Sequence, residues 1–155
     1  MFKNKFKHYF SELISQQTKP KDIARGVALG IFIGFLPVPG LGILQFFIAL
    51  FFSVILRVNK IAIILGTFIT NPFTVIPIST FSFEVGKWLL KSETPAFTLK
   101  TLTVSNILAI AKPLLAGSIV VGFAAAIVSY VVTYYIAWII YRRRKRAEEK
   151  KEEIP

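Results

Sequence analysis

The stretch GVALGIFIGFLPVPGLG, residues 26–42, decides the fold that this sequence predicts. Its first part repeats a glycine every fourth residue, at Gly26, Gly30 and Gly34. On a helix these glycines would form one flat groove. In lipid, such a groove lets a second helix approach backbone to backbone. The spacing therefore predicts close helix packing.

The second part of this stretch is a break, formed by Pro37, Pro39 and Gly40. Proline ends a helix because it lacks an amide donor and its ring clashes with the preceding turn. The apolar arms on either side are about 14–16 residues long, whereas a membrane span needs about 20. Basic residues flank both outer ends, which favours a re-entrant hairpin with both ends in the cytoplasm. One interrupted span across the bilayer is the alternative.

Composition places the chain in a membrane. Of its 155 residues 54% are hydrophobic, with a mean hydropathy of +0.63, whereas about 45–50% is usual for soluble domains. The net charge is +11, and the basic residues flank the apolar runs at both ends of the chain. Without interleaved aromatic residues this charge favours anionic lipid headgroups as the partner, and not nucleic acid. The length suits one unit.

A second apolar stretch, residues 61–83, is also interrupted. Asn71 and Pro72 form a turn signal about ten residues into it, and Pro77 adds a further break. Two such breaks are typical of transporters whose discontinuous helices meet near the middle of the membrane. We therefore expect an all-α membrane protein with two interrupted or re-entrant helices.

The remaining segments complete the predicted topology. Residues 1–17 have the spacing of an amphipathic helix lying in the membrane interface; a soluble helix docked on a partner is the alternative. Residues 18–141 form the single membrane domain, and its last part, 113–141, is a long transmembrane helix. Residues 142–155 form a charged cytoplasmic tail. Both termini are then cytoplasmic, in a multi-pass protein with the 87–112 loop outside.

The sequence lacks the parts of an enzyme. It has one histidine and no cysteine, and no recognisable base accompanies its serines and threonines. We expect no catalytic residue, no metal site and no cofactor.

Binding at the breaks is better supported. An asparagine at an Asn-Pro break serves structure or ligand, and an arginine suits phosphate. As alternatives, Arg57 reaches the headgroups, Asn59 caps a helix and Glu84 pairs with Lys87. The candidate binding residues are Arg57, Asn59, Thr67, Thr70, Asn71 and Glu84.

Two blocks of sequence resemble a prokaryotic membrane family known only as domain of unknown function 2062. The first runs from Pro20 through the glycines to FLPVPG at 35–40, and the second is GTFITNPFT at 66–74. Phe68 stands where the family pattern usually has tryptophan, which keeps an aromatic residue. The resemblance covers roughly residues 18–140. It implies a small protein of the cytoplasmic membrane, with a hint of cell-envelope work because some members look fused to glycosyltransferase-like domains.

Two functions follow as hypotheses. In the first, the protein binds or carries an anionic substrate, lipid-linked or phosphorylated, at the paired breaks. In the second, it is a non-catalytic membrane scaffold or assembly factor for cell-envelope proteins, whose grooves bind partner helices. Because so short a chain can hardly enclose a polar path alone, we expect a homo-oligomer in either case.

Overall fold

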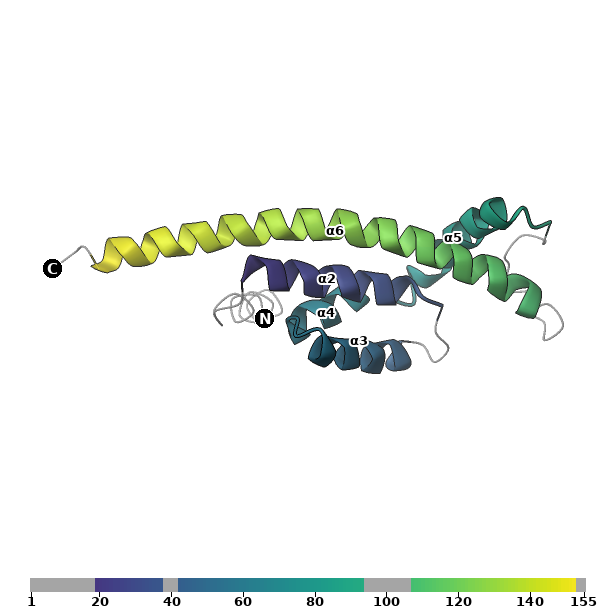
Figure 1. Ribbon diagram of the computed structural model, residues 1–155, viewed down its shortest axis with the longest axis horizontal. Helices are drawn as coiled ribbons and strands as arrows, with labels where there is room; N and C mark the ends of the chain where they lie inside the picture. The colour runs from purple at the N-terminus through teal and green to yellow at the C-terminus, as the bar shows by residue number, and fades with distance from the viewer. Residues whose placement is uncertain (1–18, 38–41, 94–106, 153–155) are drawn as a thin grey trace.

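The computed structural model describes residues 19–37, 42–93 and 107–152 (Figure 1). These residues form five α-helices and no strand, so the predicted all-α class is confirmed. The predicted interfacial helix at 1–17, and Pro39 and Gly40 of the first break, lie outside the described residues.

Helices α2 (Pro20–Phe35) and α3 (Ile43–Ile55) run in opposite directions (Figure 1). Proline at the first position opens α2, where no intrahelical donor is needed. The helix ends as Leu36 turns to extended backbone, the conformation favoured before a proline. Gly42 caps the start of α3 with a backbone φ of 88°, a left-handed conformation that favours glycine. The predicted interruption is therefore present.

Helix α4 (Lys60–Thr67) fills the glycine groove of α2. A Cβ on Gly26 would lie 2.8 Å from the Cβ of Ala62, and one on Gly30 would overlap the carbonyl of Ile63. A Cβ on Gly34 would likewise contact Thr67 and Thr70. Since residue numbers rise together along both helices, α2 and α4 are parallel.

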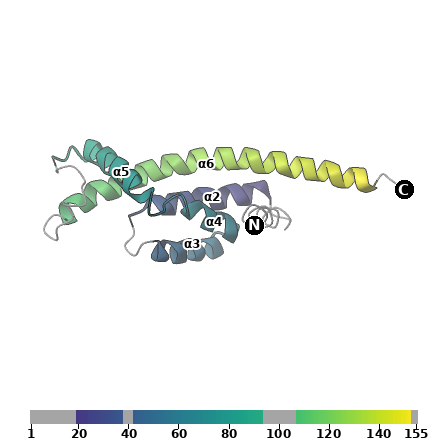
Figure 2. The same cartoon turned by 180° about the vertical axis from the view of Figure 1, so that it is seen from behind.

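The core lies between α2, α3 and α4, and Figure 2 shows α4 between the other two. Its members are apolar side chains from the facing surfaces. They are Ile33, Ala49, Val58 and Ile63, with Leu29, Ile48 and Ile64 packed against them.

Helices α5 (Val75–Leu90) and α6 (Ile107–Glu152) cross at two glycines. A Cβ on Gly86 would overlap the carbonyl of Pro113, and one on Gly117 would overlap the carbonyl of Ser82. The two backbones are therefore in direct contact. Farther along, α6 runs antiparallel to α2 (Figure 1).

Helix α6 is the membrane-spanning candidate. Its apolar segment, Ala109–Arg143, has 35 residues; the most apolar 18-residue window within it has a mean hydropathy of 2.2, and only 17% of that window is buried in the protein. Among the described helices it is the one long and apolar enough to cross a bilayer. It extends past both ends of the predicted 113–141 span, with Pro113 inside it. At its basic end, Arg142 lies over the ring of Trp138, 4.1 Å from the centroid.

The expected break at Pro77 is wrong. Pro77 lies in the first turn of α5, which continues through Leu90. The first amides of a helix have no intrahelical acceptor, so a proline there removes no hydrogen bond. The second interruption is confined to residues 68–74, between α4 and α5.

Candidate functional site

The two helix breaks meet at the side chain of Gln45. Gln45 lies in the first turn of α3 and is 7% exposed. Its Nε2 donates to the carbonyls of Ile33, Gly34 and Leu36, at 3.4, 3.2 and 2.9 Å. Thr70, from the second break, donates its hydroxyl to the same Gly34 carbonyl at 2.6 Å. Side chains from both neighbouring elements therefore cap the carboxyl end of α2.

The second break is closed by its own hydrogen bonds. Asn71 Oδ1 accepts from the amides of Phe73 and Thr74, at 2.9 and 3.1 Å. The hydroxyl of Thr74 donates to the Ile69 carbonyl at 2.7 Å and accepts from the backbone amide of Asn71 at 2.9 Å. The Asn71 side chain thus closes a turn on the backbone just before α5 begins.

A cavity of about 470 Å³ opens at this meeting point, and we name it the junction cavity. Residues of both breaks and of the first turn of α3 line it. They are Gly42, Ile43, Gln45, Phe46, Phe47, Thr67, Phe68, Thr70, Asn71 and Pro72.

The predicted binding residues divide into two groups. The structure brings Thr67, Thr70 and Asn71 together at the junction cavity. Arg57 and Asn59 lie at the opposite end of α4, and Asn59 Oδ1 caps that helix by accepting from the amides of residues 61 and 62, both at 3.0 Å. Glu84 is on α5, 3.8 Å from the ammonium of Lys87. The cap formed by Asn59 and the pairing of Glu84 with Lys87 are the structural alternatives that the sequence left open.

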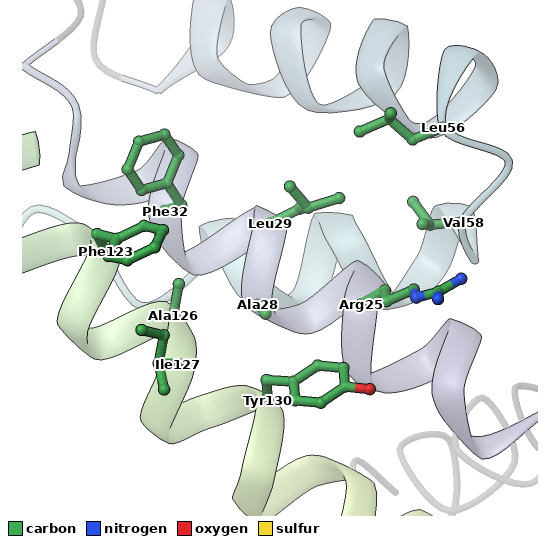
Figure 3. Close-up of a pocket in the computed structure, with 10 residues that line it drawn as sticks. All are labelled: Arg25, Ala28, Leu29, Phe32, Leu56, Val58, Phe123, Ala126, Ile127 and Tyr130. Carbon is green, nitrogen blue, oxygen red and sulfur yellow. The ribbon is translucent and has the colours of Figure 1, made fainter.

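A second concavity, of about 620 Å³, lies along α2 and is here called the trough (Figure 3). One face of α2 forms its floor, with residues at helical spacing. Helix α6 forms one wall, and the turn between α3 and α4 forms the other. The lining consists of Arg25, Ala28, Leu29 and Phe32 of α2, Phe123, Ala126, Ile127 and Tyr130 of α6, and Leu56 and Val58 of the turn.

The trough has an apolar end and a polar end. In Figure 3 the rings of Phe32 and Phe123 lie together at one end, while the Arg25 guanidinium and the Tyr130 hydroxyl lie toward the other. The side chain of Arg25 is 59% exposed, and its ion pair with Asp22 is long, at 3.9 Å. An exposed pair of this length contributes little, so the guanidinium is available to a further anion.

Arg57 stands beside this polar end. It lies between Leu56 and Val58, which both line the trough, and its side chain is exposed. A left-handed backbone with a φ of 50° turns the chain there from α3 into α4. The turn thus places the backbone of Arg57 near the end of the trough that holds Arg25.

Comparison with known proteins adds a family. A family model described as an uncharacterized protein conserved in bacteria (DUF2062) matches residues 3–147. The chain belongs to DUF2062. Neither the curated proteins nor the solved structures gave a match.

Sequence reasoning missed three functional candidates of this DUF2062 protein. Gln45 was detectable as the one amide side chain in the otherwise apolar arm that became α3. Arg25 and Tyr130 are farther apart in the sequence than any local pattern reaches, and only the antiparallel packing of α2 on α6 brings them together.

Proposed function

We propose that this DUF2062 protein is an integral membrane protein that binds an anionic amphiphile in the trough. The observation that carries this proposal is the shape and chemistry of the trough: an apolar floor and walls, with Arg25 and Tyr130 at one end. An acyl or polyprenyl chain fits the apolar part, and a phosphate or carboxylate head fits the guanidinium. No step of this proposal needs catalysis.

The orientation of the helices supports the predicted topology. The start of α2 and the end of α3 lie toward the same end of the bundle as the basic run of α6, 142–146 (Figure 1). Basic residues mark the cytoplasmic side of a membrane protein. In our proposal α6 crosses the inner membrane, α2 and α3 form a re-entrant hairpin from the cytoplasmic side, and both termini are cytoplasmic. The polar end of the trough then lies at the cytoplasmic headgroups.

The trough is a better anion site than the breaks, where the sequence had placed one. At the junction the Gln45 amide and the Thr70 hydroxyl already donate to carbonyls of α2. The Oδ1 atom of Asn71 already accepts a hydrogen bond from the backbone amide of Phe73. Among the described residues, the guanidinium of Arg25 has only a weak partner, Asp22. The proposed anion site therefore moves from the breaks to the cytoplasmic end of α2.

The scaffold hypothesis has less support. Its binding surface was the glycine groove of α2, and α4 of the same chain occupies that groove. A partner helix would have to displace α4 to use it. Homo-oligomerisation stays a prediction, and the groove is not the surface that would mediate it.

Replacing Arg25 with glutamine is expected to weaken binding of an anionic lipid at least about tenfold, because a hydrogen bond to a charged group contributes about 1.5–3 kcal/mol. Native mass spectrometry of the protein, purified from its own membrane and then titrated with phosphatidylglycerol, measures the bound fraction. It also counts the subunits. Arg57→Gln is expected to weaken binding less, since Arg57 flanks the trough without lining it.

Lys21→Gln is the matched control. Lys21 is an exposed cation on the same helix and does not line the trough. If all three variants lost lipid equally, the effect would come from general surface charge, and the trough would not be the site. Binding unchanged in Arg25→Gln would contradict the proposal directly.

A further inference from the structure

We propose that the junction cavity binds a monovalent metal cation of the sodium or potassium class. This site is separate from the trough, because it lies at the carboxyl end of α2 whereas Arg25 lies near the amino end. It does not depend on the proposed function.

Two helix carboxyl ends point at the junction cavity. Helices α2 and α4 are parallel, and Phe35 and Thr67 end them side by side, with Gly34 in contact with Thr67 and Thr70. An uncapped carboxyl end carries about half a negative charge, and the donors from Gln45 and Thr70 reduce that charge at the end of α2. The amino end of α3 also lies there, and its partial positive charge offsets one of the two negative carboxyl ends. The balance favours a cation of low charge.

The hydroxyl groups of the cavity offer lone pairs. Thr67 donates its proton to the Ile64 carbonyl at 2.7 Å, and Thr70 donates to the Gly34 carbonyl at 2.6 Å. A hydroxyl has one proton and two lone pairs. With these protons committed, both threonines can only accept from, or coordinate, what enters the cavity.

Gln45 adds a fixed amide oxygen. Its Nε2 is held by three carbonyls, which sets the orientation of the whole amide group. Its Oε1 lies 4.0 Å from the Cβ position of Gly42, another lining residue, and accepts no hydrogen bond from the described part of the chain. A residue that is 7% exposed thus brings to the cavity an acceptor that has no partner among the described residues. Such an acceptor can take a hydrogen bond from a donor or coordinate a cation.

The ligand set selects the class of cation. Neutral amide, hydroxyl and carbonyl oxygens are hard ligands, and the described residues that line the cavity include no carboxylate or basic side chain. Calcium and magnesium sites normally include carboxylates. Half-helix carboxyl ends with neutral oxygens are how discontinuous helices hold sodium. A monovalent ion is therefore the fitting occupant.

Thermal unfolding in detergent tests the site, using the fluorescence of Trp88 and Trp138 as the readout. The protein is compared in sodium, potassium and choline chloride at equal ionic strength. Sodium or potassium is expected to raise the Tm by about 3 °C or more over choline, because a ligand that binds only the folded state stabilises it. Equal Tm values in all three salts would overturn the proposal.

Thr67→Val and Thr80→Val form a matched pair of variants. Both remove a hydroxyl that donates to a carbonyl of its own helix, at 2.7 Å for Thr67 and 2.9 Å for Thr80, and only Thr67 lines the cavity. The cation shift is expected to disappear in Thr67→Val and to persist in Thr80→Val. A shift kept in Thr67→Val would overturn the assignment. If Thr67→Val does not fold, radioactive sodium and potassium binding to the wild-type protein decides: saturable uptake of one supports the site, and none overturns it.

Discussion

Replacing Gly30 with alanine is expected to prevent α2 from packing on α4. A methyl group there would overlap the backbone carbonyl of Ile63 and approach the Cα of Gly66 to 2.8 Å. No side-chain rotation relieves an overlap with backbone, so the two helices must separate. Overpacking of this kind costs about 1–3 kcal/mol and occasionally more, and here the whole interface moves. We expect a loss of more than about 3 kcal/mol, with aggregated or degraded protein in the membrane.

Gly34→Ala on the same helix is the control. The added methyl would lie 3.0 Å from the Thr70 hydroxyl and 3.4 Å from a methyl group of Ile69, and such side-chain neighbours can shift. Both substitutions gain the same helix propensity, about 1 kcal/mol. Size-exclusion chromatography in detergent and unfolding midpoints measure the difference. A Gly30→Ala protein as stable as Gly34→Ala would show that the groove is not closely packed.

Replacing Gln45 with leucine is expected to destabilise the protein by about 1–3 kcal/mol. The amide of Gln45 is shared by three carbonyls at the end of α2, and a buried acceptor left without a donor costs about 1–3 kcal/mol. Thr70 would still donate to Gly34 and the Leu36 amide to Ile33, so among the described residues only the Leu36 carbonyl loses its donor and the cost is about one such penalty. Leucine keeps the apolar volume, so the loss reports the hydrogen bonds.

Ser53→Ala is the comparison for Gln45→Leu. Ser53 is also buried on α3, at 1% exposure, but its hydroxyl donates within the helix, to the Leu50 carbonyl at 2.6 Å. Its removal leaves no carbonyl of a neighbouring helix end uncapped, and we expect a change below about 1 kcal/mol. Reversible unfolding in mixed micelles measures both variants. Similar losses would mean that Gln45 contributes only as one more buried polar group.

The sequence predicted the local features of the fold. The glycine spacing of α2, the interruption after Phe35 and the long apolar helix are all present, because each depends on residues close together in the chain. It did not predict which helix fills the groove. A four-residue glycine repeat fits a helix of the same chain as well as one from another copy, and only the short α4 after the turn at Arg57 decides between them.

The candidate sites were harder to predict, for a physical reason. Thr70 and Asn71 stood out because polar residues at a break are unusual in an apolar run. Arg25 resembled any basic residue at the edge of a membrane helix, and its relation to Tyr130 arises from the antiparallel packing of α2 on α6. Pro77 was misread because its effect depends on its place within the helix, which propensity alone does not give.

The unequal lengths of the helices give the protein a wedge-shaped profile in the proposed orientation. Helices α2, α3 and α4 have 16, 13 and 8 residues, or roughly 24, 20 and 12 Å at 1.5 Å per residue, less than the hydrocarbon thickness of about 30 Å. These three helices do not extend past the point where Phe35 packs against Gly122. Of the described helices, only α5 and α6 continue past it, away from the basic end of α6 (Figure 1). In this orientation the cytoplasmic leaflet gives up more area to protein than the outer leaflet, and the molecule is suited to membrane that bulges toward the cytoplasm.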